Sequence, residues 1–161
     1  MVIWIIGLSG AGKTTLAKEI ISKVHEKNVV LIDGDIIRKV IGKNLGHTLE
    51  DRLENAGRIC RLCKFLDNQG IHVVCAILSI FPESRLWNKN NIKNYYEVYI
   101  ETPIDQLQKR DYKGLYRKFN EGKIKNVVGM DIEFIPPKSP DLIINNHGAI
   151  GNLLTHANFL S

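Results

Sequence analysis

A glycine-rich segment near the start of the chain, Gly7-Leu-Ser-Gly-Ala-Gly-Lys-Thr14, follows an apolar run and precedes a helical pattern. It fits the spacing G-x-x-x-x-G-K-S/T. Glycines let the backbone curl until successive N–H groups face an anion, and the positive end of the next helix adds to that field. The lysine reaches the β- and γ-phosphates and the threonine hydroxyl ligates Mg²⁺. The spacing therefore predicts a strand–loop–helix unit that binds a nucleoside triphosphate, with ATP as the expected ligand.

The rest of the chain alternates between short apolar runs and helical patterns. Continuous apolar runs are typical of parallel strands covered on both faces. We therefore expect an α/β fold, namely a three-layer P-loop NTPase fold with a five-stranded parallel sheet. The expected strands are Val2–Ile6, Val29–Ile32, His72–Leu78, Glu97–Ile100 and Leu142–Ile144. The expected helices are Lys13–Lys27, Glu50–Gln69, one that follows Thr102-Pro103, and Ile150–Phe159.

The helix expected at Glu50–Gln69 carries an apolar face and two of the three cysteines. The face comprises Leu53, Ala56, Cys60, Cys63, Phe65 and Leu66. Cys60 and Cys63 form a C-x-x-C pair, but no second Cys or His pair lies nearby at zinc spacing. We expect buried, reduced thiols and no zinc site.

Size and hydropathy suit one domain, over residues 1–161. The chain is 44% hydrophobic, which excludes a disordered polymer, and no apolar run reaches the length of a membrane span. The expected location is the cytoplasm, with no membrane partner.

The net charge of +5 has a local origin. Residues 109–125 contain seven Lys and Arg but only two Asp and Glu, whereas the remaining residues are balanced. A local surplus argues against a broad nucleic-acid surface and favours a small anionic substrate. We expect residues 109–138 to form a basic surface excursion, called here the predicted lid.

The sequence also separates classes of phosphate-loop protein. No N-K-x-D-like segment that would read guanine follows the loop, and no apolar strand ends in D-x-x-G. A small-molecule kinase is therefore favoured over a GTPase.

Several blocks together resemble the adenylylsulfate kinase family, whose members transfer the γ-phosphate of ATP to the ribose 3′-hydroxyl of adenylylsulfate. The blocks occur in order over about three quarters of the chain. They are Gly7–Thr15, Ile32–Arg38, Asn44–Gly46 with Glu50–Arg58, Arg110–Tyr116 and Glu121–Lys125.

The resemblance implies roles for individual residues. Asp35 would orient or deprotonate the attacking hydroxyl, with Lys13 and Lys113 as further catalytic residues. Thr14, and Asp33 through water, would hold Mg²⁺. Asp-Gly-Asp also fits a turn that caps the next helix. The implied ATP-binding residues are Gly7, Ser9, Gly10, Ala11, Gly12, Lys13, Thr14, Thr15 and, from the predicted lid, Arg110. The implied acceptor-binding residues are Asp33, Arg38, His47, Arg52, Asn55, Ser79, Lys125 and Val127.

The departures from the family pattern lie around the acceptor base. His47 replaces one phenylalanine, and Asn126-Val127-Val128-Gly129 replaces D-F-T-G, which carries the other. In the family these two phenylalanines enclose the adenine ring. The segment Ile77–Pro82 also differs from the family's F-I-S-P-F-R. Family members in capsule pathways phosphorylate cytidine diphosphoramidate instead, so both acceptors stay open.

Two other interpretations of the function, and the oligomeric state, stay open. The chain could be another small P-loop kinase, acting on a nucleoside monophosphate or a hydroxy acid, or a non-catalytic nucleotide-binding module. Family dimers are common, but this sequence begins at the first strand, without the residues that usually precede it, so a homodimer is an expectation that the sequence leaves open.

Overall fold

The computed structural model describes residues 1–24, 28–41 and 44–148 of the chain. Its eleven elements alternate as expected for an α/β fold. In chain order they are β1 (Val2–Ile6), α1 (Lys13–Lys23), β2 (Val29–Asp33), α2 (Gly34–Val40), α3 (Leu49–Asn68), β3 (His72–Ile77), α4 (Pro82–Asn91), β4 (Tyr95–Glu101), α5 (Ile104–Arg110), α6 (Leu115–Asn120) and β5 (Leu142–Asn145).

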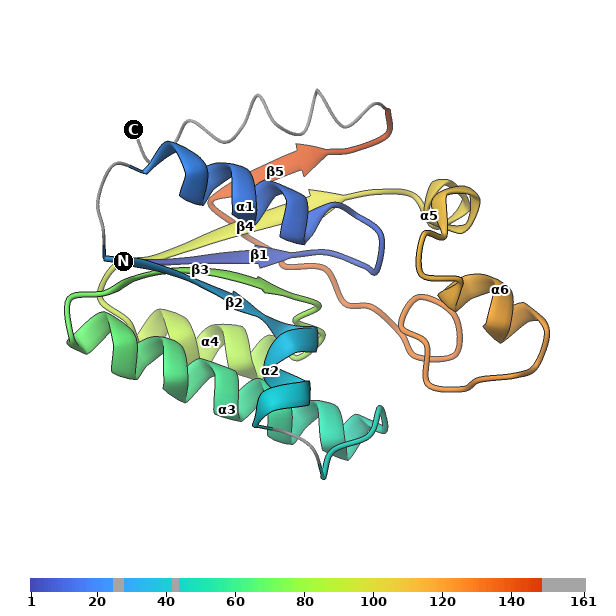
Figure 1. Cartoon of the computed structure of the whole chain (residues 1–161), viewed down its shortest axis with the longest axis horizontal. Helices are drawn as coiled ribbons and strands as arrows, with labels where there is room; N and C mark the ends of the chain where they lie inside the picture. The colour runs from blue at the N-terminus through green and yellow to red at the C-terminus, as the bar shows by residue number, and fades with distance from the viewer. Residues whose placement is uncertain (25–27, 42–43, 149–161) are drawn as a thin grey trace.

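The five strands form one parallel sheet in the order β2-β3-β1-β4-β5. Helix α1 covers one face, and α2, α3 and α4 lie on the other (Figure 1). The predicted three-layer fold is therefore confirmed. Helices α5 and α6 lie beyond the carboxyl ends of the strands, on the right in Figure 1. Ligands bind at this edge of open parallel sheets, and here the order places β1 between β3 and β4.

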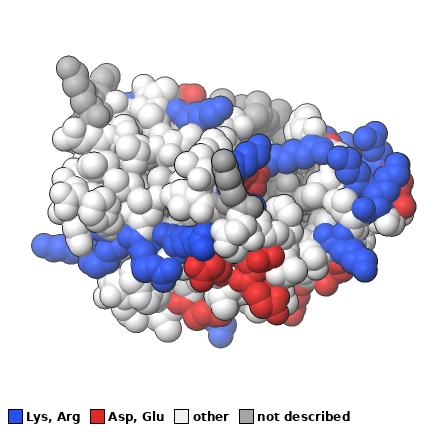
Figure 2. Space-filling model, turned by 60° about the horizontal axis from the view of Figure 1, so that its bottom comes forward, with Lys and Arg blue, Asp and Glu red and all other residues white. Residues whose placement is uncertain are grey.

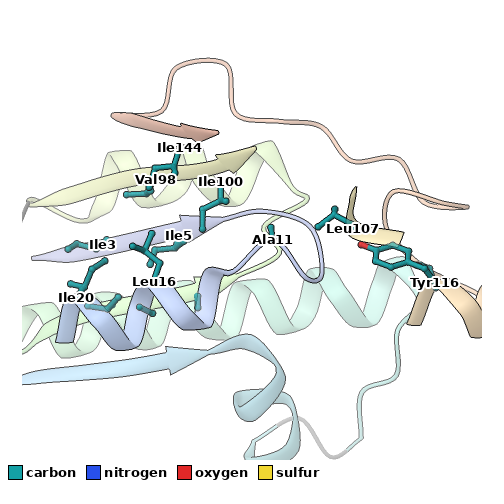
Figure 3. Close-up of a cluster of buried hydrophobic side chains, with 14 residues drawn as sticks. Ile3, Ile5, Ala11, Leu16, Ile20, Val98, Ile100, Leu107, Tyr116 and Ile144 are labelled. Carbon is teal, nitrogen blue, oxygen red and sulfur yellow. The ribbon is translucent and has the colours of Figure 1, made fainter. Parts of the chain in front are cut away.

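The central strand β1 is buried on both faces, so its side chains alternate between two cores. Ile3 and Ile5 pack with Leu16 of α1 in one core, which Figure 3 shows. Trp4 lies in the other core with Ile59 of α3. This two-sided burial explains why the strand is a continuous apolar run rather than an alternating one.

The three cysteines are free and buried, as predicted for the pair at Cys60 and Cys63. The apolar face predicted for the α3 helix is partly wrong, because Leu53 and Phe65 are 45% and 59% exposed. Ile59, which the predicted face omitted, is fully buried instead. Within the described residues, the structure contains no helix long and apolar enough to span a bilayer.

Several boundaries differ from expectation. Helix α1 ends at Lys23, whereas the sequence pattern predicts it to Lys27. Strand β4 is longer than predicted at both ends. Helices α4 and α6 were not predicted, and α2 was expected only as a helix that Asp-Gly-Asp could cap. The helix predicted at Ile150–Phe159 lies outside the described residues.

The predicted lid is more than the surface excursion expected from its charge. It contains α6, and Tyr116, Val127 and Val128 are each buried. Tyr116 belongs to the same core as Ala11 and Leu107, and Figure 3 shows it beside the phosphate loop. Its hydroxyl donates to the carbonyl of Ser9 at 2.8 Å. Apolar packing against the phosphate loop therefore fixes part of this basic segment.

Candidate active site

The phosphate loop between β1 and α1 requires glycine at three positions. Gly10 and Gly12 have φ of 83° and 99°, in the left-handed region that L side chains rarely adopt. A Cβ on Gly7 would lie 2.9 Å from the carbonyl oxygen of Ile100 on β4. These positions let the loop curl tightly over the end of the sheet, directly before α1 begins at Lys13. Loop and helix terminus together suit an anion.

Lys13 folds back over this loop, and its Nζ donates to the carbonyl of Leu8 at 2.9 Å. Burial, together with the positive charge of Lys113, lowers the pKa of Lys13 to about 8, although Asp35 and Asp33 act in the opposite direction. A buried ammonium group is stabilised by an anion placed beside it. The site is therefore electrostatically prepared for a polyphosphate.

Asp33 uses its two carboxylate oxygens for different purposes. One accepts from the Thr14 hydroxyl at 2.7 Å. The other accepts from the backbone N–H groups of Asp35 and Ile36 and so caps α2. The capping interpretation of Asp-Gly-Asp is thus correct, and it leaves the second oxygen beside the phosphate loop.

Asp35 forms an ion pair with Lys113 of the predicted lid, with Oδ2 and Nζ 2.6 Å apart. Both side chains are about two-thirds exposed. Burial alone would raise the pKa of Asp35, but the hydrogen bond and charge of Lys113, with the charges of Lys13 and Arg38, hold it below its usual range. Asp35 is therefore a carboxylate at neutral pH. This contact joins α2 to the turn between α5 and α6.

Two pockets meet at the phosphate loop. One of about 410 Å³, called here the donor pocket, is lined by residues 10 and 12–15, and by Arg110, Tyr112, Lys113, Asn146 and Gly148. A larger pocket of about 840 Å³, called here the acceptor pocket, lies on the α2 side. Its lining includes the predicted catalytic Asp35 and the predicted acceptor residues Asp33, Arg38, His47, Arg52, Lys125 and Val127. It also includes Ser9, which was predicted to bind ATP and does not line the donor pocket. Lys13, Thr14 and Lys113 line both pockets, so they lie at the junction between them.

Arg52 of α3 fixes one wall of the acceptor pocket. Its Nε donates to the carbonyl of His47 at 2.9 Å, and its Nη2 donates to the carbonyl of Asn126 at 2.7 Å. The carboxylate of Asp131 in turn accepts hydrogen bonds from the backbone N–H groups of Asn126 and Val127, at 2.8 and 2.6 Å. The loop before α3 and the predicted lid are thus held together.

His47 lies on this pocket beside two cations. Partial burial, followed by the charges of Arg38 and Arg52, lowers the pKa of the His47 imidazole. Arg38 donates to the carbonyl of Gly46. A neutral imidazole, with one donor and one acceptor nitrogen, is therefore available to a ligand at neutral pH.

The structure does not place two of the predicted acceptor residues on either pocket. Ser79 is 6% exposed, and its hydroxyl accepts from Trp4 Nε1 at 2.9 Å. Asn55 is 4% exposed, and its Oδ1 has no hydrogen-bond partner within the described part of the chain. Their contact with an acceptor stays a prediction.

Other lining residues were not predicted from the sequence. The polar and aromatic ones include Lys39, Lys118 and Asn126 on the acceptor pocket and Tyr112 and Asn146 on the donor pocket. Asn146 directly follows β5, and its side chain donates to the carbonyl of Ala11 at 2.9 Å. Its position after a strand end was the available signal. Figure 2 shows Lys and Arg side chains gathered over the α5–α6 end of the molecule.

Known proteins are similar to this chain in sequence. The family model of adenylylsulphate kinase matches residues 1–145. A cytidine diphosphoramidate kinase of Campylobacter jejuni is 41% identical, over 90% of this chain and 85% of its own. An adenylyl-sulfate kinase of Pseudomonas aeruginosa is 40% identical, over 89% of this chain and 76% of its own.

A solved structure agrees with these relatives. The APS kinase of Mycobacterium tuberculosis in complex with AMPPNP and APS superposes with a TM-score of 0.86 at 31% identity. The match covers 96% of this chain and 92% of the other. Sequence and fold together show that the chain belongs to the adenylylsulphate kinase family.

Proposed function

We propose that this chain is an ATP-dependent kinase that phosphorylates the ribose 3′-hydroxyl of a nucleotide carrying a phosphoric anhydride. The observation that carries the proposal is the meeting of two pockets at Lys13, Thr14 and Lys113. Phosphoryl transfer depends mainly on holding donor and acceptor in line and neutralising charge between them. A donor pocket and an acceptor pocket joined at two lysines meet both requirements.

The groups at this junction suit distinct tasks. Lys13 and Lys113 supply positive charge where the γ-phosphate would lie. Asp35, held as a carboxylate, accepts the hydrogen of the attacking hydroxyl. It is paired with Lys113 at 2.6 Å, so a γ-phosphate that attracts Lys113 would release the carboxylate for the acceptor.

The oxygen donors beside the loop fit magnesium. Thr14 Oγ1 and Asp33 Oδ2 lie 2.7 Å apart. Within the described residues, no cluster of three His, Cys, Asp or Glu could hold a metal ion alone. Mg²⁺ in kinases keeps waters and takes most other ligands from substrate phosphates, so a hydroxyl and one nearby carboxylate suffice. When bound, the ion would neutralise charge on the β- and γ-phosphates.

For the acceptor we propose cytidine diphosphoramidate, the substrate that names the Campylobacter jejuni relative. None of the described residues that line the acceptor pocket is Phe, Tyr or Trp. Stacking on an aromatic ring contributes about 1–3 kcal/mol per base. A purine base would therefore bind with less free energy in this pocket than in one that has such a ring. Arg38, Arg52 and Lys125 still suit an anhydride, and neutral His47 can hydrogen-bond a pyrimidine edge. A cytoplasmic role in capsule synthesis belongs to this proposal.

Adenylylsulfate is the second candidate, because the Pseudomonas aeruginosa relative is nearly as similar as the first. Both acceptors carry the ribose and the anhydride and differ in the base. The assay that separates them is ADP release with each acceptor, measured with ATP and Mg²⁺.

The kinase proposal itself is tested with Asp35→Asn. We expect turnover to fall by about 10²–10⁴-fold while ATP binding is kept. Glu121→Gln is the matched control, since this carboxylate pairs with Lys123 and lines neither pocket, and it should keep full turnover. ADP release with neither acceptor would refute the proposal and favour a nucleotide-binding module, whereas release only with a nucleoside monophosphate or a hydroxy acid would favour another P-loop kinase.

A further inference from the structure

Tyr112 is a large aromatic residue that is 86% exposed at the donor pocket. It is the only aromatic among the described residues that line this pocket. Its side chain forms no hydrogen bond or ring contact within the described part of the chain. An aromatic ring that is left in water at the rim of a ligand pocket is suited to cover a planar ligand.

The backbone that carries this ring is fixed. Tyr112 lies in the turn between α5 and α6, where Gly114 N–H donates to the carbonyl of Asp111 at 2.8 Å. The carboxylate of Asp111 accepts from the N–H groups of Tyr116 and Arg117, at 3.1 and 2.9 Å. An exposed ring on an anchored turn costs little further backbone ordering when it binds.

The far side of the donor pocket is also fixed. Arg110 Nη2 donates to the carbonyls of Asn146 and Gly148, at 3.1 and 3.0 Å. The pocket is lined by the phosphate loop and by a second group of residues, Arg110, Tyr112 and Gly148, called here its rim. With the phosphates of a nucleotide in the loop, the base is the part of the ligand that reaches this rim.

We propose that Tyr112 is a donor-binding residue whose ring packs on the face of the purine base. This inference rests on the proposed function only in that the donor is a purine nucleoside triphosphate. A ring that packs on a face does not read the edge of the base. ATP and GTP therefore gain equally from Tyr112, and any preference between them arises elsewhere.

Equilibrium binding separates the base from the phosphates. The ligands are AMPPNP, its guanine counterpart and inorganic tripolyphosphate, each titrated into wild type, Tyr112→Ala and Tyr112→Phe by calorimetry. Tyr112→Ala should weaken both nucleotides by about 5- to 150-fold, the equivalent of one stacked base. Tripolyphosphate, which has no base, should bind all three proteins within about twofold. Tyr112→Phe keeps the ring and should bind every ligand like wild type.

Three results would overturn the inference. They are unchanged nucleotide binding by Tyr112→Ala, an equal loss of nucleotide and tripolyphosphate, and a loss in Tyr112→Phe as large as in Tyr112→Ala. Leu86→Ala removes an exposed side chain on α4, away from both pockets, and is the control for apolar truncation. In turnover, Tyr112→Ala should raise KM for ATP with kcat and the acceptor KM nearly unchanged. Because binding needs no acceptor, failure of the proposed reaction would leave this test intact.

Discussion

The charge on Lys13 gives a prediction about the pH dependence of nucleotide binding. Its pKa of about 8 lies well below the ordinary 10.5, chiefly because of burial and then because of Lys113. That displacement corresponds to about 3 kcal/mol against the ammonium form in the ligand-free protein. A bound polyphosphate places negative charge beside Nζ and raises the pKa again, so the ligand favours the protonated lysine.

The sign of the pH effect follows. Below pH 8 the lysine is already charged, and affinity for a triphosphate should not depend on it. Above pH 8 the free protein must take up a proton on binding, so affinity should fall by about tenfold per pH unit. Between pH 7 and pH 9.5 the loss should reach about 30-fold, as long as the bound pKa lies above 9.5.

Calorimetric titration of AMPPNP into the protein measures this directly. Repeating each titration in two buffers of different ionisation enthalpy counts the protons taken up, which should approach one per nucleotide near pH 9. Lys13→Arg is the matched control, because a guanidinium does not titrate in this range. Its affinity should be independent of pH. Wild-type affinity that stays flat to pH 9.5, without proton uptake, would refute the assigned environment of Lys13.

Two further predictions concern the pocket walls. His47→Phe places a larger apolar ring at an exposed position on the acceptor pocket, so kcat/KM for adenylylsulfate should rise by about fivefold or more in steady-state assays. No change would mean that the base does not reach residue 47. Asp111→Ala removes the acceptor of two backbone N–H groups at the start of α6 and should lower the free energy of unfolding by about 0.5–2 kcal/mol in urea titrations. Unchanged stability would show that this cap contributes nothing.

The sequence predicts those elements whose buried side chains are apolar. Strand β1 and helix α3 follow this rule, although the face of α3 was misjudged at both Leu53 and Phe65. Helix α4 was missed because its buried side chains are Arg85 and Asn88, which no hydrophobic pattern reveals. Arg85 donates to the carbonyls of Ser79 and Ile135, so this buried charged side chain joins α4 to two other segments of the chain.

No bounds were predicted for helix α2, for another reason. It has seven residues and none of them is buried. Ile36 and Val40 lie one turn apart but are 54% and 68% exposed, so its apolar residues do not mark a core face, and its start depends on the cap from Asp33.

The phosphate loop was predictable because its spacing is local. The ion pair between Asp35 and Lys113 joins residues 78 positions apart, and only family resemblance suggested that they share a site. Tyr112 lies inside the matched block Arg110–Tyr116, but the sequence does not show which pocket the turn faces, and its importance depends on that.

The most direct test of the proposed function is a competition between its two acceptors. Cytidine diphosphoramidate and adenylylsulfate are mixed at equal concentration with ATP and Mg²⁺, and the two 3′-phosphorylated products are separated and quantified. Their ratio at low conversion equals the ratio of kcat/KM values, so no separate active-site titration is needed. An acceptor pocket without Phe, Tyr or Trp among its described lining predicts that the cytidine product dominates. Predominant formation of 3′-phosphoadenylylsulfate would contradict the proposed acceptor, and the absence of both products would contradict the proposed kinase.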